Sequence, residues 1–168
     1  MIPLRLAGPA SIAILCAVLA VAAPAHAVVS ISVPSPVNLG SRGTGAGTLS
    51  AQLGTVTVTA SGLVAPSFLA TVSASNFTTG SGSANETIAK ASVSYWSGPA
   101  TATSGLASAT PGQLTALQAV SLSSPRTAFS GTGLLLSISA SWNPTVVINV
   151  PGAAVAGAYS GVITHSVA

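Results

Sequence analysis

Hydrophobic and polar residues alternate one by one along much of this chain. In residues 55–59 two valines alternate with three threonines, which places the valines on one face of an extended strand and the threonines on the other. Similar runs rich in β-branched or aromatic residues predict further strands at residues 68–73, 91–96, 119–123, 145–150 and 158–167. A period of two is typical of strands that bury only one face.

Clusters of Gly, Ser, Thr and Pro separate these runs, at residues 40–47, 79–85 and 97–112. We predict that they are loops, because Gly loses much conformational entropy on ordering and Pro lacks a backbone donor. Leu114 and Leu117, three residues apart, indicate one helical turn at most. Strands at regular spacing predict one all-β domain, an immunoglobulin-like antiparallel β-sandwich of about seven to nine strands.

The first 27 residues have a different character. Arg5 lies in a short start, residues 12–23 are apolar, and the small residues Ala25 and Ala27 flank His26. This layout is typical of a secretory signal peptide, so we expect cleavage after Ala27 and a mature domain at residues 28–168. The apolar stretch is shorter than the ~20 residues of a spanning helix, so we expect no membrane span after cleavage. The protein is predicted to be secreted, extracellular or cell-wall associated.

Charged residues are very scarce. They make up 3% of the chain, against roughly 25% in an ordinary soluble domain. Glu86 is the only acidic side chain, and after removal of the signal peptide His165 is the only histidine and no cysteine remains. Paired-carboxylate catalysis and side-chain metal sites need more titratable groups than this, and nucleic-acid binding needs clustered cations. We therefore expect no enzyme, no cofactor or metal, and no nucleic-acid partner.

Several stretches resemble one family. They are residues 68–77, the segments Tyr95–Ala100 and Trp142–Thr145, and the end of the chain at residues 150–152 and 156–167. Together they are similar to WxL-type surface domains of Gram-positive bacteria, and more closely to secreted WxL-like proteins of actinobacteria. The two Trp-x-Leu positions hold Phe68-Leu69-Ala70 and His165-Ser166-Val167 instead. The resemblance implies a β-sandwich that attaches non-covalently to peptidoglycan.

Six residues are candidates for contact with a surface component or glycan: Phe68, Leu69, Tyr95, Trp96, Trp142 and His165. Tyr95 and Trp96 point to opposite faces of their strand, so only one of them can face the core. Trp142 is a core residue by default, and the alternative is a sugar-stacking platform beside the Asn143-Pro144 turn. His165 is interpreted as a hydrogen-bonded structural residue, with a binding role as the alternative.

Tyr159 follows a bend at Ala156-Gly157 and shares a strand face with Gly161. We predict a structural role for Tyr159, Gly157 and Gly161, with the tyrosine ring packed on the core and its hydroxyl bound to loop backbone. The leading hypothesis for function is an exported, non-enzymatic protein that binds peptidoglycan or other cell-surface proteins and glycans. The alternative is a self-assembling structural subunit, because uncharged Thr/Val strands lack the Lys and Pro residues that block edge pairing.

Overall fold

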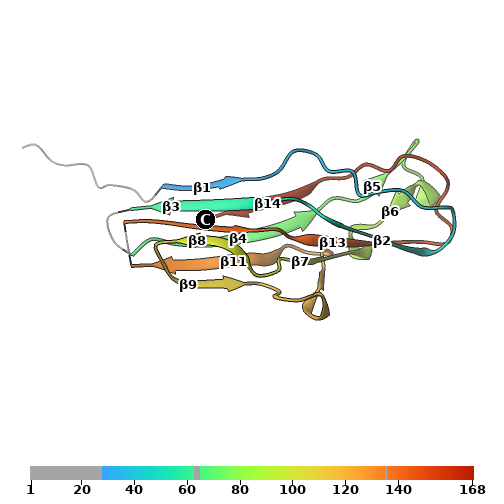
Figure 1. Cartoon of the computed structure of the whole chain (residues 1–168). Coiled ribbons are helices and arrows are strands. Elements are labelled where there is room, and N and C mark those ends of the chain that lie inside the picture. Colours follow the sequence, from blue (N-terminus) through green and yellow to red (C-terminus); the bar gives the residue numbers. More distant parts are fainter. Residues whose placement is uncertain (1–27, 63–64, 135) are drawn as a thin grey trace, which may run out of the picture.

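The structure is a computed structural model, and it describes residues 28–62, 65–134 and 136–168. These residues form fourteen strands and three short 3-10 helices in an elongated, layered body (Figure 1). The strands are β1 (Val28–Ser32), β2 (Gly47–Gln52), β3 (Val56–Ser61), β4 (Ser67–Ala74), β5 (Phe77–Thr78), β6 (Thr87–Ile88), β7 (Val93–Trp96), β8 (Ala100–Ser104), β9 (Leu106–Pro111), β10 (Val120–Ser121), β11 (Arg126–Gly133), β12 (Ser137–Trp142), β13 (Thr145–Val150) and β14 (Ile163–Val167). The helices are η1 (Ala84–Glu86), η2 (Lys90–Ser92) and η3 (Ala116–Gln118).

The first layer is made of two four-stranded antiparallel sheets, in the orders β1-β3-β12-β8 and β10-β7-β13-β2. Strand β2 leads into β3, β7 into β8 and β12 into β13. The chain therefore passes directly from one sheet into the other at three places, and the two sheets lie end to end. At the junction the Leu53 N–H donates to the Pro144 carbonyl across 2.9 Å. Gly98, at the β7–β8 junction, has a φ of +72°, which a residue with a side chain rarely adopts. The layer is thus a long sheet with a break in its middle.

The second layer contains β14-β4-β11-β9, also antiparallel. It continues past the end of β4, because the Ser75 N–H donates to the Val162 carbonyl across 2.8 Å. Beyond that point Thr78 of β5 bridges to Ser160, and β5 pairs with β6. This extension is narrower than the main sheet.

The core lies between the two layers and follows the alternation of the sequence. In β3, Val56, Val58 and Ala60 are at most 1% exposed. The threonines between them, Thr57 and Thr59, face outward and are half-buried and exposed. Full burial of one valine side chain is worth roughly 1.5–3 kcal/mol. The apolar face predicted for residues 55–59 is therefore confirmed.

The all-β antiparallel sandwich predicted from the sequence is confirmed, whereas several predicted boundaries are wrong. The predicted loop at residues 97–112 contains β8 and β9, because β12 and β11 supply backbone partners to a Ser/Thr-rich stretch whatever its side chains are. The predicted strand at residues 158–167 begins only at Ile163. The chain has more strands than the seven to nine expected, since the junctions divide long strands into shorter ones. The helical turn predicted near Leu114 and Leu117 is confirmed as η3.

No helix among the described residues is long and apolar enough to cross a membrane. The predicted signal peptide, residues 1–27, lies outside the described residues.

Candidate functional site

Three side chains that the sequence analysis singled out form a hydrogen-bonded chain in the core. Trp142 Nε1–H donates to Tyr95 Oη across 3.3 Å, and Tyr95 Oη lies 3.2 Å from His165 Nε2. Trp142 and Tyr95 are fully buried, and His165 is half-buried on β14. An indole N–H can only donate, so the Tyr95 hydroxyl accepts from Trp142 and donates its own proton to His165. This order requires a neutral His165 that carries its proton on Nδ1.

Burial keeps this chain in the required protonation state. It lowers the pKa of His165 from 6.5 to about 4 and raises the pKa of Tyr95 well above its ordinary value. Both groups are therefore uncharged at pH 7. The aromatic rings pack closely as well, with Phe129 stacked on Trp142 at a centroid distance of 4.9 Å and an interplanar angle of 19°. The geometry is that of a satisfied polar chain inside an aromatic core.

Burial rules out three of the six candidate contact residues. Phe68, Tyr95 and Trp142 are at most 4% exposed, so none of them can stack on a sugar or contact a partner. The cause is that each lies on the inward face of its strand, and Trp142 ends β12 inside the core rather than at an exposed loop. Leu69 is 46% exposed and Trp96 is half-buried.

Of the three remaining candidates, His165 is half-buried at the end of the hydrogen-bonded chain, and Leu69 and Trp96 do not form one surface. Leu69 faces outward from the second layer, where β4 pairs with β11. Trp96 faces outward from the first layer, where β7 pairs with β13. The sandwich lies between them, so a single ligand-binding surface cannot include both.

Tyr159 packs against the core and holds two loops. Its hydroxyl lies 3.1 Å from the Asn85 carbonyl and 3.0 Å from the Val155 carbonyl, either of which can accept its proton. Gly157 and Gly161 let the segment that carries Tyr159 lie close to β5 and to Thr79, the residue that follows it. A Cβ on Gly161 would lie 2.7 Å from the Phe77 ring, and a Cβ on Gly157 would lie 2.6 Å from a threonine hydroxyl.

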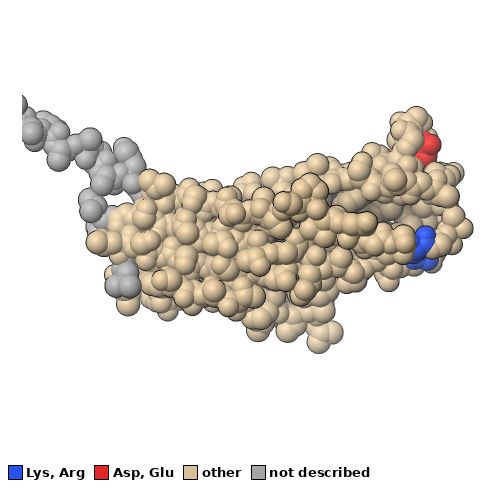
Figure 2. Space-filling model, turned by 45° about the horizontal axis from the view of Figure 1, so that its top comes forward, with Lys and Arg blue, Asp and Glu red and all other residues tan. Residues whose placement is uncertain are grey.

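An open groove lies at the end of the molecule formed by β2, β13, β5 and β6. It consists of two cavities of about 720 and 330 Å³, which share Pro36, Val37, Leu39, Phe77 and Gly161. Figure 2 shows a hollow in the surface at the end of the molecule that carries the charged side chains drawn there. The groove's volume is in the range of small-molecule sites.

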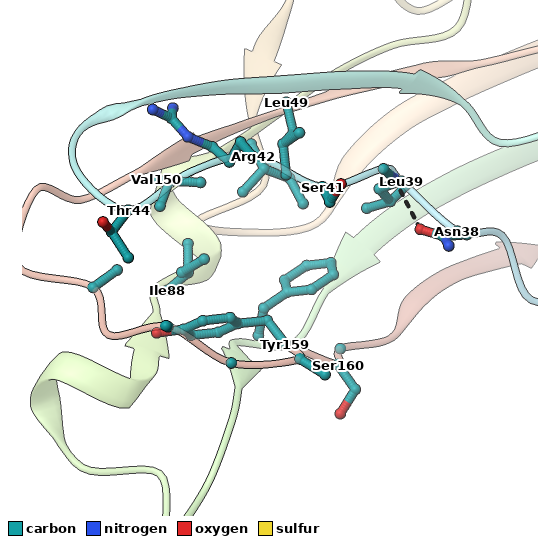
Figure 3. A pocket seen from close by; sticks show the side chains of 18 of the residues that line it. Asn38, Leu39, Ser41, Arg42, Thr44, Leu49, Ile88, Val150, Tyr159 and Ser160 are labelled. Atoms are coloured by element: carbon teal, nitrogen blue, oxygen red, sulfur yellow. Dashed lines mark hydrogen bonds between the residues drawn. The ribbon is translucent and has the colours of Figure 1, made fainter.

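Side chains from both layers line this groove. Leu49, Ile148 and Val150 come from the first layer, and Phe77 and Ile88 come from the second. Figure 3 shows Leu49, Val150, Ile88 and Tyr159 around the cavity, with Leu39 and Arg42 on the segment that crosses it. The lining is mainly aliphatic and aromatic. His165 borders the smaller cavity, so the groove reaches from the loop of Arg42 to the histidine of the buried chain.

Residues 33–45, called the strap here, form one side of the groove. Outside the strands, none of the backbone–backbone hydrogen bonds of the described residues begins or ends in the strap. Leu39 anchors it by packing against the core. Within the strap, Asn38 Oδ1 accepts from the Gly40 N–H at 2.9 Å. The strap is thus held to the body by side-chain packing, a weaker tie than a strand ladder.

Two charged side chains at this end are Arg42, on the strap, and Glu86, in η1 next to β6. The Arg42 guanidinium donates from Nε to the Gly43 carbonyl and from Nη2 to the Ala46 carbonyl, at 3.2 and 2.8 Å. Glu86 accepts from the Ser83 N–H and the Ser81 hydroxyl, which lowers its pKa to about 2. Among the described residues no three His, Cys, Asp or Glu side chains gather as metal ligands.

No family model, curated protein or solved structure matches the chain.

Sequence reasoning missed the groove. Its strap lacks any periodic pattern, and residues 40–47 were predicted only as a loop. The one available signal was the run of Val33, Val37 and Leu39 between prolines and glycines, which is unusually apolar for a solvated loop.

Proposed function

We propose that this protein is an exported, non-enzymatic β-sandwich of the cell surface or cell wall, which binds other surface components non-covalently. The observation that supports this most is that the hydrogen-bonded aromatic and histidine side chains are largely buried, whereas the open groove is mainly apolar. Among the described residues, the hydrogen-bonded chain of Trp142, Tyr95 and His165 lies in the core and reaches the groove only at His165, whereas the groove is lined mainly by apolar side chains. Such a molecule is suited to contact rather than to acid–base chemistry.

The outward faces support the same proposal. Ser and Thr alternate along them, and neighbouring hydroxyls bind each other across strands, as Ser30 with Thr59 at 2.6 Å and Ser108 with Thr132 at 2.8 Å. Figure 2 shows one face of the molecule on which Lys, Arg and Glu are almost absent. Contacts made by such a surface depend little on ionic strength, because salt screens charges and not hydroxyl or apolar contacts.

Wall association can be tested by sedimenting residues 28–168 with purified cell-wall sacculi at moderate and high salt. We expect retention at both salt concentrations. Trp96→Ser removes the one aromatic candidate that reaches the outer face of the first layer, and Leu69→Ser is the matched change on the opposite layer. Loss of retention in one variant identifies the binding face. Recovery of all wild-type protein in the supernatant would rule out wall binding.

A second candidate function, self-assembly by strand addition, is favoured by β8. This strand pairs only with β12 in the described structure, and four of its five residues are exposed. It contains neither charge nor proline, the residues that usually protect an edge. A free, uncharged edge can accept a strand from another copy.

Sedimentation velocity across a concentration series tests this alternative. Self-assembly predicts larger species in the wild-type protein and fewer in Thr103→Lys, which places a charge on the β8 edge. Thr132→Lys, on the paired strand β11, is the control and is expected to assemble as the wild type does. A strict monomer at high concentration contradicts self-assembly.

A further inference from the structure

We propose that the groove binds a single-chain anionic amphiphile, with the aliphatic tail between the layers and the anionic head group at Arg42. The inference goes beyond wall association and does not depend on it. It stands on the shape and lining of the groove, on the polar groups that border it, and on the charge at its mouth.

The lining favours an aliphatic chain over a polypeptide. A peptide carries an N–H and a C=O at every residue, and each costs free energy when it is buried without a partner. The two largest uncharged polar side chains of the main cavity are already engaged: Tyr159 binds loop carbonyls and Asn38 binds the strap backbone. Most of the remaining lining is the apolar surface of residues such as Leu49, Phe77 and Ile148.

The mouth of the groove selects the head group. Arg42 is exposed and, among the residues that the structure describes, is the only charged one that lines either cavity. Two of its N–H groups are bound to carbonyls of its own loop, which fixes the guanidinium in place. An arginine has five N–H donors, so the others can bind a carboxylate or phosphate oxygen. Gly47 keeps this position possible, because a Cβ there would overlap the guanidinium.

The acidic side chain at this end does not cancel the attraction. Glu86 is engaged by Ser81 and Ser83, and it is not among the residues that line the two cavities. The groove mouth therefore has a net positive charge. An anionic head group and an apolar tail match its two parts, the charged mouth and the apolar interior.

Titration calorimetry with octanoate, decanoate and dodecanoate, each below its micelle concentration, tests the tail. Each methylene that enters the groove is expected to tighten binding about fourfold, until the groove is filled. Ala156→Trp fills the groove from an exposed lining position and is expected to weaken every member of the series. Thermal unfolding of this variant checks that the fold is intact.

Arg42→Gln tests the head group. We expect it to weaken dodecanoate about three- to fivefold, the range of an exposed ion pair, and to leave the uncharged dodecan-1-ol unchanged. Arg126→Gln is the matched control, because Arg126 also donates to a backbone carbonyl but does not line the groove. It should leave both ligands unchanged.

Three results would overturn the proposal. One is no binding of any chain length, and another is an equal loss in Arg42→Gln and Arg126→Gln, which would indicate general charge attraction. The third is weakening by His165→Gln but not by Arg42→Gln, which would place the head group at the inner end of the groove.

Discussion

The two halves of this molecule are made of the same uncharged residues and yet are packed differently. In the closed half, β3 and β12 face β4 and β11, and inward residues such as Val58, Ala70 and Ala140 are completely buried. In the open half, β2 and β13 face only the two-residue strands β5 and β6. There Leu49 and Val150 stay half-buried, and a groove remains.

The difference shows that strand pairing, rather than composition, decides where this chain packs densely. Where strands pair over their whole length, their hydrogen bonds fix each layer, so that apolar side chains of the two layers pack against each other in the core. Where the second layer narrows, the strap takes the place of strands, and it has no ladder of its own. The open half is therefore expected to be both the less stable and the more adaptable part of the molecule.

The largest expected effect is in the closed half. Phe129→Ala removes a fully buried ring that stacks on Trp142, and deletion of such a ring should cost about 3–5 kcal/mol of unfolding free energy. Denaturant unfolding of the purified variant measures this loss. A loss below about 1 kcal/mol would contradict the dense packing that we assign to this half.

The next effect concerns the hydrogen-bonded chain of Trp142, Tyr95 and His165. The folded-state pKa of His165 is lowered to about 4 from 6.5, so between these values the unfolded state binds more protons. Stability should fall as the pH decreases from 6.5 to 4, by about 3 kcal/mol, and this term should be constant below pH 4. Unfolding curves at several pH values measure it.

His165→Gln is the control for that titration. The glutamine Oε1 can accept the Tyr95 proton but does not titrate, so the loss between pH 6.5 and 4 should disappear. Glu86 contributes in a separate window, because its pKa of about 2 makes its stabilising effect decrease only as the pH falls from 4.5 toward 2. An unchanged slope above pH 4.5 in His165→Gln would show that another group is responsible.

Most of the closed half could be predicted from the sequence, because its strands alternate cleanly. Val56 and Val58 alternate with threonines, which predicts that both valines face inward. Tyr95 and Trp96 are adjacent, which predicts that only one of the two faces inward. The prediction is wrong where pairing partners outweigh local preference, as in β8 and β9, whose Ser, Thr and Pro residues favour loops. The residues of a segment do not show which other strands will pair with it in the folded sheet.

The candidate site was less predictable than the fold. The sequence suggests Phe68 and Trp142 as contact candidates, but they are the large apolar groups that a charge-poor core needs, and both are buried. The groove depends on residues far apart in the sequence, such as Leu39, Ile88 and Val150. Their meeting follows from the topology and not from spacing along the chain.

A smaller effect tests the close packing on β5. Gly161→Ala places a methyl group 2.7 Å from the Phe77 ring, and the overlap should cost about 1–3 kcal/mol. Gly43→Ala, in the strap, is the matched control, since nothing lies within 4 Å of the added Cβ and its φ is not positive. It should be neutral or stabilising by less than about 1 kcal/mol. Equal destabilisation by both changes would contradict the tight contact.

The smallest expected effect on global stability distinguishes the halves most directly. Leu39→Ala shortens the side chain that anchors the strap, and because Leu39 is only partly buried the cost should be about 1 kcal/mol. Limited proteolysis should nevertheless cut residues 33–45 faster, because they lack backbone bonds to the body, while the β3 amides keep their protection from hydrogen exchange. If the β3 amides lost protection in step with the faster cleavage of the strap, the two halves would unfold as one unit and the comparison would fail.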